Sequence, residues 1–146
     1  MAMFLSTITD RGSTPGLVKT MAFTQKRLRM ISENVANVHT PGYKAKTLDV
    51  KGFQRALGRA FLEHQKDINR PFVVENGDQV HTNERGYLEV TPTDQAGRNI
   101  LFHDGTNLSI ERQMADLAET GMVHEMATTL VRGNFDRLRK AIRGIV

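Results

Sequence analysis

The stretch from Leu17 to Tyr43, LVKTMAFTQKRLRMISENVANVHTPGY, determines the predicted fold. Its apolar positions recur at alternating intervals of four and three residues, which is the heptad pattern of a helix with one buried face. The residues on this face are Leu17, Met21, Thr24, Leu28, Ile31, Val35 and Val38. Thr40-Pro41-Gly42 then ends the pattern, because proline disfavours helical angles in the preceding residue and Pro-Gly suits the centre of a type II turn. The stretch predicts a core helix over residues 17–38, followed by a turn.

A second heptad pattern runs through the C-terminal part of the chain and predicts a core helix over residues 109–146. Ser109 is a favourable N-cap, and the basic residues near the C-terminus complement the helix dipole. The positions in this pattern are Ile110, Met114, Leu117, Gly121, His124, Thr128, Val131, Phe135, Leu138, Ile142 and Ile145. A second apolar set lies beside it: Met122, Met126, Leu130, Ala118, Ala127 and Ala141. One partner helix cannot cover both sets, so we expect this helix to pack on several neighbours, some of them from other chains.

The segments outside these helices carry no long-range periodicity. Residues 1–16 end in a run of turn-forming residues and are predicted to be a mobile N-terminal segment. Residues 39–108 are predicted to be a turn and an irregular middle segment, with a short helix at 50–64 and short strands at 72–74, 87–90 and 100–102. The predicted fold class is therefore mainly α: two long helices form a single domain, joined by a loop-rich middle with small β elements.

The amino-acid composition excludes several classes of protein and suggests that the chain does not close a core alone. Of the 146 residues, 39% are hydrophobic and 6% aromatic, which is low for a closed globule, and we expect a partner to complete the core. The absence of cysteine excludes a disulfide scaffold, a thiol nucleophile and cysteine-ligated zinc. No apolar run has the length of a membrane span, and the first eleven residues lack the features of a cleaved secretory signal.

The net charge of +4 conceals three blocks of alternating sign. Residues 1–74 carry 12 basic and 5 acidic residues, residues 75–125 carry 3 and 10, and residues 126–146 carry 5 and 1. This arrangement suits either a nucleic-acid binder or an assembly with complementary surfaces. The predicted N-terminal helix offers contacts to phosphates through a basic face of Lys19, Lys26, Arg27 and Arg29. No helix-turn-helix pattern or interleaved aromatic residues accompany them, which favours a solvated basic face.

Patterns that carry catalysis are absent from the sequence. The five histidines are scattered, with no metal-ligand spacing, and neither a phosphate-binding loop nor a nucleophile elbow occurs. We therefore predict that the chain is not an enzyme and has no catalytic, cofactor-binding or metal-binding residues.

Three stretches resemble the flagellar basal body rod proteins. Residues 31–45 are similar to a signature of rod and hook subunits, in which the matching residues include Asn34, Asn37, Thr40, Pro41, Gly42 and Tyr43. Residues 104–119 resemble the block that opens the C-terminal helix, although Arg112 and Gln113 replace residues that are often acidic. Residues 135–144 resemble the tail that distinguishes the short proximal rod type from its longer relatives.

The resemblance implies a structural subunit of the proximal rod, the drive shaft that transmits torque from the motor to the hook and filament. It implies that the two core helices pair antiparallel and that the subunit is exported by the flagellar type III apparatus without a cleaved signal. The implied partners are other copies of the chain, other rod proteins, the rod adaptor, and the membrane ring and export gate of the basal body, with no nucleic acid. The alternative reading is a basic helical module that binds nucleic acid or another anionic surface.

The implied residues fall into three groups, of which the motif turn is given above. The assembly interface would comprise Leu17, Met21, Leu28, Ile31, Val35, Met114, Leu117, Val131, Phe135, Leu138 and Ile142. Phe4 and Ile8 fit a short pattern that early rod and hook subunits present to the export gate.

Overall fold

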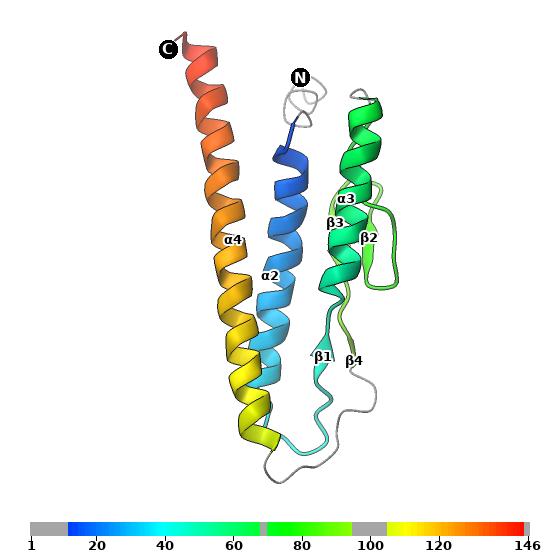
Figure 1. The fold of residues 1–146 in the computed structure, drawn as a ribbon, viewed down its shortest axis with the longest axis vertical. Coiled ribbons are helices and arrows are strands. Elements are labelled where there is room, and N and C mark those ends of the chain that lie inside the picture. Colours follow the sequence, from blue (N-terminus) through cyan, green and yellow to red (C-terminus); the bar gives the residue numbers. More distant parts are fainter. Residues whose placement is uncertain (1–11, 68–69, 95–104, 145–146) are drawn as a thin grey trace.

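The computed structural model describes residues 12–67, 70–94 and 105–144, and this part of the chain is mainly helical (Figure 1). Its elements, in chain order, are α2 (Thr14–Ala36), β1 (Lys46–Thr47), α3 (Val50–Lys66), β2 (Val80–Thr82), β3 (Leu88–Val90), β4 (Thr93–Asp94) and α4 (Gly105–Arg143). The predicted fold class, two long helices with small β elements in the middle, is confirmed. No helix in the described ranges carries an apolar stretch long enough to cross a membrane.

The helix α2 lies at the centre of the molecule, with α4 on one side and α3 and the strands on the other (Figure 1). Polar contacts fix α4 antiparallel to α2, since they join the start of one helix to the end of the other. The amide of Asn134 donates to the hydroxyl of Thr14 over 3.1 Å, and the carboxylate of Asp116 lies 3.5 Å from the guanidinium of Arg27. The antiparallel helix pair implied by the resemblance is therefore present.

The structure shifts the ends of both long helices from their predicted positions. α2 begins at Thr14, three residues before the predicted start, with Pro15 in its first turn. Proline is well suited to that position because the first helical N–H groups have no intrahelical acceptor. α2 ends at Ala36, and α4 begins at Gly105. The predicted mobile segment thus contributes its last three residues to α2, and its first eleven lie outside the described residues.

The hydrophobic core lies between α2 and the middle segment. Its buried residues are Phe23, Met30, Ile31, Leu48, Phe53, Ala60, Phe72, Val74, Val80 and Val90. The rings of Phe23 and Phe53 stack in parallel with centroids 4.0 Å apart, which joins α2 to α3. The buried residues on the described part of α4 are Thr120 and Ala127, and neither belongs to this cluster. The core of a single chain therefore lies mainly between α2 and the middle segment, and Leu117 of α4 packs against it.

The middle segment follows its predicted outline only in part. The predicted helix at 50–64 is α3, whose N-cap Asp49 accepts the N–H of Gly52 over 2.9 Å. The predicted strand at 87–90 is β3, which pairs antiparallel with β2, and a second pair joins β1 to β4. Residues 72–74 were predicted as a strand but form none, although Phe72 and Val74 are buried in the core. The predicted strand at 100–102 lies outside the described residues.

A buried lysine attaches the β2–β3 hairpin to α2. Lys19 is 6% exposed, and its ammonium donates a hydrogen bond to the carbonyl of Gly86 in the hairpin turn. Gly86 has a φ of 78°, a left-handed conformation that suits a residue without a side chain. The hairpin is thus fixed to the face of α2 that packs on the middle segment.

Candidate functional site: the helix pair and the Asn34 turn

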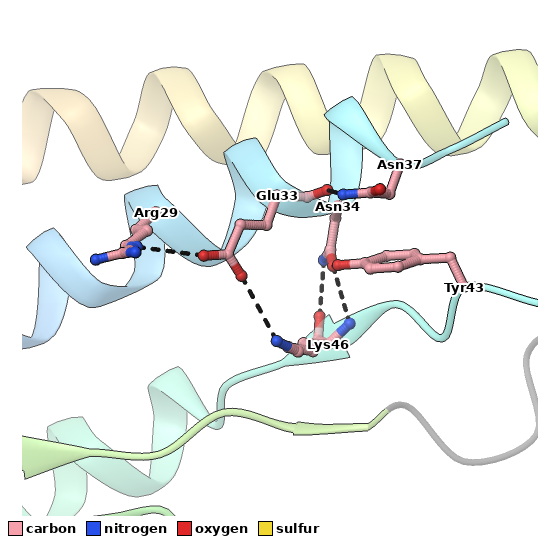
Figure 2. A network of polar contacts seen from close by, with 6 residues as sticks. All are labelled: Arg29, Glu33, Asn34, Asn37, Tyr43 and Lys46. Atoms are coloured by element: carbon pink, nitrogen blue, oxygen red, sulfur yellow. Dashed lines mark hydrogen bonds and ion pairs between the residues drawn. The ribbon is translucent and has the colours of Figure 1, made fainter. Parts of the chain in front are cut away.

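Asn34, in the last turn of α2, links that helix to the start of the middle segment (Figure 2). Its side-chain carbonyl accepts the N–H of Lys46 over 2.9 Å and the hydroxyl of Tyr43 over 3.0 Å. Its amide donates to the carbonyl of Lys46 over 2.8 Å. Asn34 is only 5% exposed, so these bonds replace water at a buried polar group and fix the chain after the turn against α2.

The predicted turn has the predicted geometry. The N–H of Tyr43 bonds the carbonyl of Thr40 over 3.2 Å, and Gly42 has a φ of 78°, as a type II turn requires at its third residue. The side-chain amide of Asn37 donates to the carbonyl of Glu33 over 2.8 Å, and the backbone N–H of Asn37 donates to the same carbonyl over 3.1 Å, so this residue caps the end of α2. Asn37 thus bonds a carbonyl within its own helix, whereas Asn34 bonds a carbonyl twelve residues along the chain.

Ion pairs surround the same turn and neutralise much of the basic face of α2. The carboxylate of Glu33 lies 3.2 Å from the guanidinium of Arg29 and 3.5 Å from the ammonium of Lys46 (Figure 2). Arg27, whose side chain is 15% exposed, pairs with Asp116 of α4. Two of the four basic residues proposed to contact phosphates are therefore paired with carboxylates, whereas Lys19 is buried and Lys26 is exposed.

The face of α4 that packs on α2 is small and polar. The residues of low exposure along it recur at intervals of four and three: Gln113, Leu117, Thr120, His124, Ala127, Val131, Asn134 and Leu138. Its two most buried members are Thr120 at 1% and Ala127 at 2% exposure, and their small side chains allow the helices to approach closely. Nδ1 of His124 is hydrogen-bonded to the hydroxyl of Thr24 over 2.8 Å in the middle of this contact.

This face coincides with half of the heptad pattern read from the sequence. Leu117, His124, Val131 and Leu138 belong to both, whereas the remaining positions lie one residue earlier than predicted. As a result Met114, Phe135 and Ile142 are 51%, 42% and 74% exposed and are not buried by the helix pair of a single chain. On α2 the predicted seam lies where expected, and all its members from Leu17 to Val35 are buried or half-buried.

The C-terminal end of α4 extends beyond the first residue of α2 (Figure 1). Asn134 contacts Thr14, so residues 135–143 continue past that point for about 13 Å at 1.5 Å per residue. This extension, residues 135–143, carries exposed Phe135 and Ile142 together with a group of basic side chains: Arg137, Arg139, Lys140 and Arg143.

Sequence reasoning did not identify two residues that organise the fold. Lys19 was treated as part of a basic face, although its position four residues before Phe23 on the same helix face was a signal for burial. Lys46 supplies the backbone groups that bind Asn34, and no local pattern indicates such a partner. Within the described ranges, no group of three or more His, Asp or Glu side chains is arranged to hold a metal ion. Phe4 and Ile8 lie outside the described residues.

Comparisons with known proteins agree with this geometry. Residues 17–44, which span most of α2 and the Asn34 turn, match the family model of flagella basal body rod protein. The chain is 29% identical over 119 residues to the flagellar basal body rod protein FlgB of Borrelia hermsii, an alignment that covers 80% of this chain and 85% of the relative. It is 24% identical over 135 residues to FlgB of Bacillus subtilis, covering 91% and 95%. No solved structure matches the chain significantly. The chain is thus similar over most of its length to flagellar basal body rod proteins, and the family model matches α2 and the turn that follows it.

Proposed function

We propose that the chain, like the flagellar basal body rod proteins to which it is similar, is a structural component of the rod in the flagellar basal body. We propose that the chain is a subunit of the proximal rod, which assembles with other copies of itself and with other rod proteins into the shaft that transmits torque to the hook and filament. Its further partners are the rod adaptor and the membrane ring and export gate. The subunit performs no catalysis and binds no nucleic acid in this role.

The extension of α4 beyond α2 is the observation that best supports this proposal. α4 spans 39 residues, about 58 Å, and residues 135–143 continue past the start of α2 with Phe135 and Ile142 exposed to solvent. Exposed apolar residues that continue an existing helix contact are suited to a helix of a neighbouring subunit. A shaft that carries torque needs each subunit to be held at several places, and this extension offers one.

The sequence-derived assembly residues can be divided by this geometry. Those buried or half-buried within the chain, such as Ile31 and Leu117, hold the subunit together, and those left exposed, such as Phe135 and Ile142, contact neighbouring subunits. Export through the flagellar type III apparatus without a cleaved signal, with Phe4 and Ile8 at the export gate, completes the proposal.

The test is the substitution Ile142→Asp in a flagellated bacterium that depends on this chain. Because this side chain is 74% exposed, the variant should fold and be exported as the wild type is, while basal bodies with complete rods and motility are lost. Ile142→Leu is the matched control and should swim normally. Normal motility with normal basal bodies in the Ile142→Asp strain would contradict the proposal.

The alternative reading, a nucleic-acid binder, is tested on the purified protein. We expect no shift of duplex DNA at low salt, because Arg27 and Arg29 already face carboxylates. Salt-dependent binding that falls when Lys26, Arg27 and Arg29 are replaced by alanine would support that alternative instead.

A further inference from the structure

A lateral face of α4, about a third of a turn away from the face that packs on α2, is exposed along most of the helix. It comprises Ala115, Glu119, Met122, Val123, Met126, Leu130, Gly133, Arg137 and Ala141, and we call it the lateral face. Its four large apolar side chains are 66%, 37%, 60% and 49% exposed in the order Met122, Val123, Met126 and Leu130. Four adjacent exposed apolar residues on one side of a helix indicate a contact surface.

Eight of the nine positions of the lateral face form four pairs that lie symmetrically about the level of Thr128, whereas Met122 has no counterpart on the face because the symmetric residue, Asn134, contacts α2. Met126 and Leu130 lie two residues on either side of that level, and Val123 and Gly133 lie five residues from it. Two copies of α4 laid antiparallel across a two-fold axis at this level would therefore place each Met126 against the Leu130 of the second copy. Each Val123 would meet a glycine, and the missing side chain there allows the two helices to approach closely.

The charges of the lateral face fit the same pairing. Glu119 and Arg137 lie nine residues before and nine residues after the level of Thr128, so each acidic residue would face a basic residue of the second copy. Along one helix the two are 18 residues, or about 27 Å, apart and cannot pair with one another. Neither takes part in an ion pair within the part of the chain that the structure describes. The ends of the face carry Ala115 opposite Ala141, which are small enough to leave the charged pairs in contact.

We propose that the lateral face binds the lateral face of a second copy of this chain, forming an antiparallel two-fold dimer in solution. A two-fold contact uses the same surface on both partners and closes after two subunits, whereas a growing shaft needs contacts between different surfaces. The dimer is thus a form that does not polymerise, and it covers Met122 and Met126, which are exposed in the free subunit. This inference goes beyond the rod function and does not depend on it.

A charge exchange on the full-length protein tests the pairing by sedimentation equilibrium. Glu119→Arg places two arginines opposite one another at both ends of the dimer, and Arg137→Glu places two glutamates there. Each variant alone should dimerise at least tenfold more weakly than the wild type. An equimolar mixture of the two should regain a dimer within about threefold of the wild-type affinity, because both contacts are again between opposite charges.

Matched controls carry the same charge changes elsewhere on α4. Glu125→Arg and Arg132→Glu alter exposed residues about a third of a turn away from the lateral face and should dimerise as the wild type does. Met126→Asp should leave a monomer, and far-UV circular dichroism should show unchanged helicity in every variant. A wild-type protein that is monomeric at 100 µM, or a mixture no tighter than its two components, would overturn the proposal. Loss of motility in the Ile142→Asp strain would still support the rod function in that case.

Discussion

Removal of the Asn34 side chain tests whether the motif turn holds the middle segment on α2. The substitution Asn34→Ala removes three hydrogen bonds of 2.8–3.0 Å, two of them to the backbone of Lys46 and one to the hydroxyl of Tyr43. A net loss of about 1 kcal/mol per bond gives a destabilisation of about 3 kcal/mol. This is a large part of the 5–15 kcal/mol that is typical for the unfolding of a domain.

Urea unfolding followed by circular dichroism measures this loss. At a slope of roughly 1.5 kcal/mol per molar urea, the midpoint should fall by about 2 M. Tyr43→Phe is the internal control, because it removes only the hydroxyl and should cost about 1 kcal/mol. If Asn34→Ala unfolded within about 0.5 kcal/mol of the wild type, or no more readily than Tyr43→Phe, the turn would not hold the two parts together.

Two further predictions concern α2 and α3. A methyl group at Gly16 would clash with the ring of Phe61, so Gly16→Ala should destabilise the protein by about 1–3 kcal/mol. Gly58 lies in α3 with open space around it, so Gly58→Ala should stabilise the protein by about 0.5–1 kcal/mol. Opposite signs in thermal unfolding would support this packing, and equal signs would contradict it. The hydrogen bond from Lys66 lowers the pKa of the exposed Glu63 carboxyl, so Lys66→Ala should raise that pKa toward its ordinary value in an NMR titration. Because the pKa of Glu63 is lower in the folded protein than in the unfolded chain, this ion pair stabilises the fold at pH values above the unfolded-state pKa. The stabilisation is lost as the pH falls through the folded-state pKa of Glu63.

Local signals in the sequence predicted the elements that depend on local chemistry. The heptad pattern and Thr40-Pro41-Gly42 predicted α2 and its turn, because periodic burial and backbone restriction both act over a few residues. The same reasoning predicted the existence of α4 and α3. The start of α2 was missed by three residues, since Pro15 and Gly16 were read as turn formers, although proline also begins helices.

Contacts between distant residues were not predictable in the same way. Phe23 and Phe53 are thirty residues apart, and nothing in the sequence marks them as a stacked pair. The packing face of α4 was misplaced by one residue at every second position, because Thr120 and Ala127 are buried while the larger Met114 remains exposed. Hydrophobicity alone predicts that Met114 is buried and that Thr120 and Ala127 are exposed. The observed order of burial follows from the close approach of α2, which leaves room only for small side chains.

The separation of the core from α4 has a consequence for the order of folding. Every buried member of the core cluster lies between Phe23 and Val90, within a contiguous part of the chain that precedes α4. During synthesis from the N-terminus, this part is complete before α4 emerges, so its contacts can form without waiting for the rest of the chain. The contacts of α4 with α2 span about a hundred residues and close the longest loop of the fold, which makes them late. We therefore expect the subunit to acquire its core first and its long helix last.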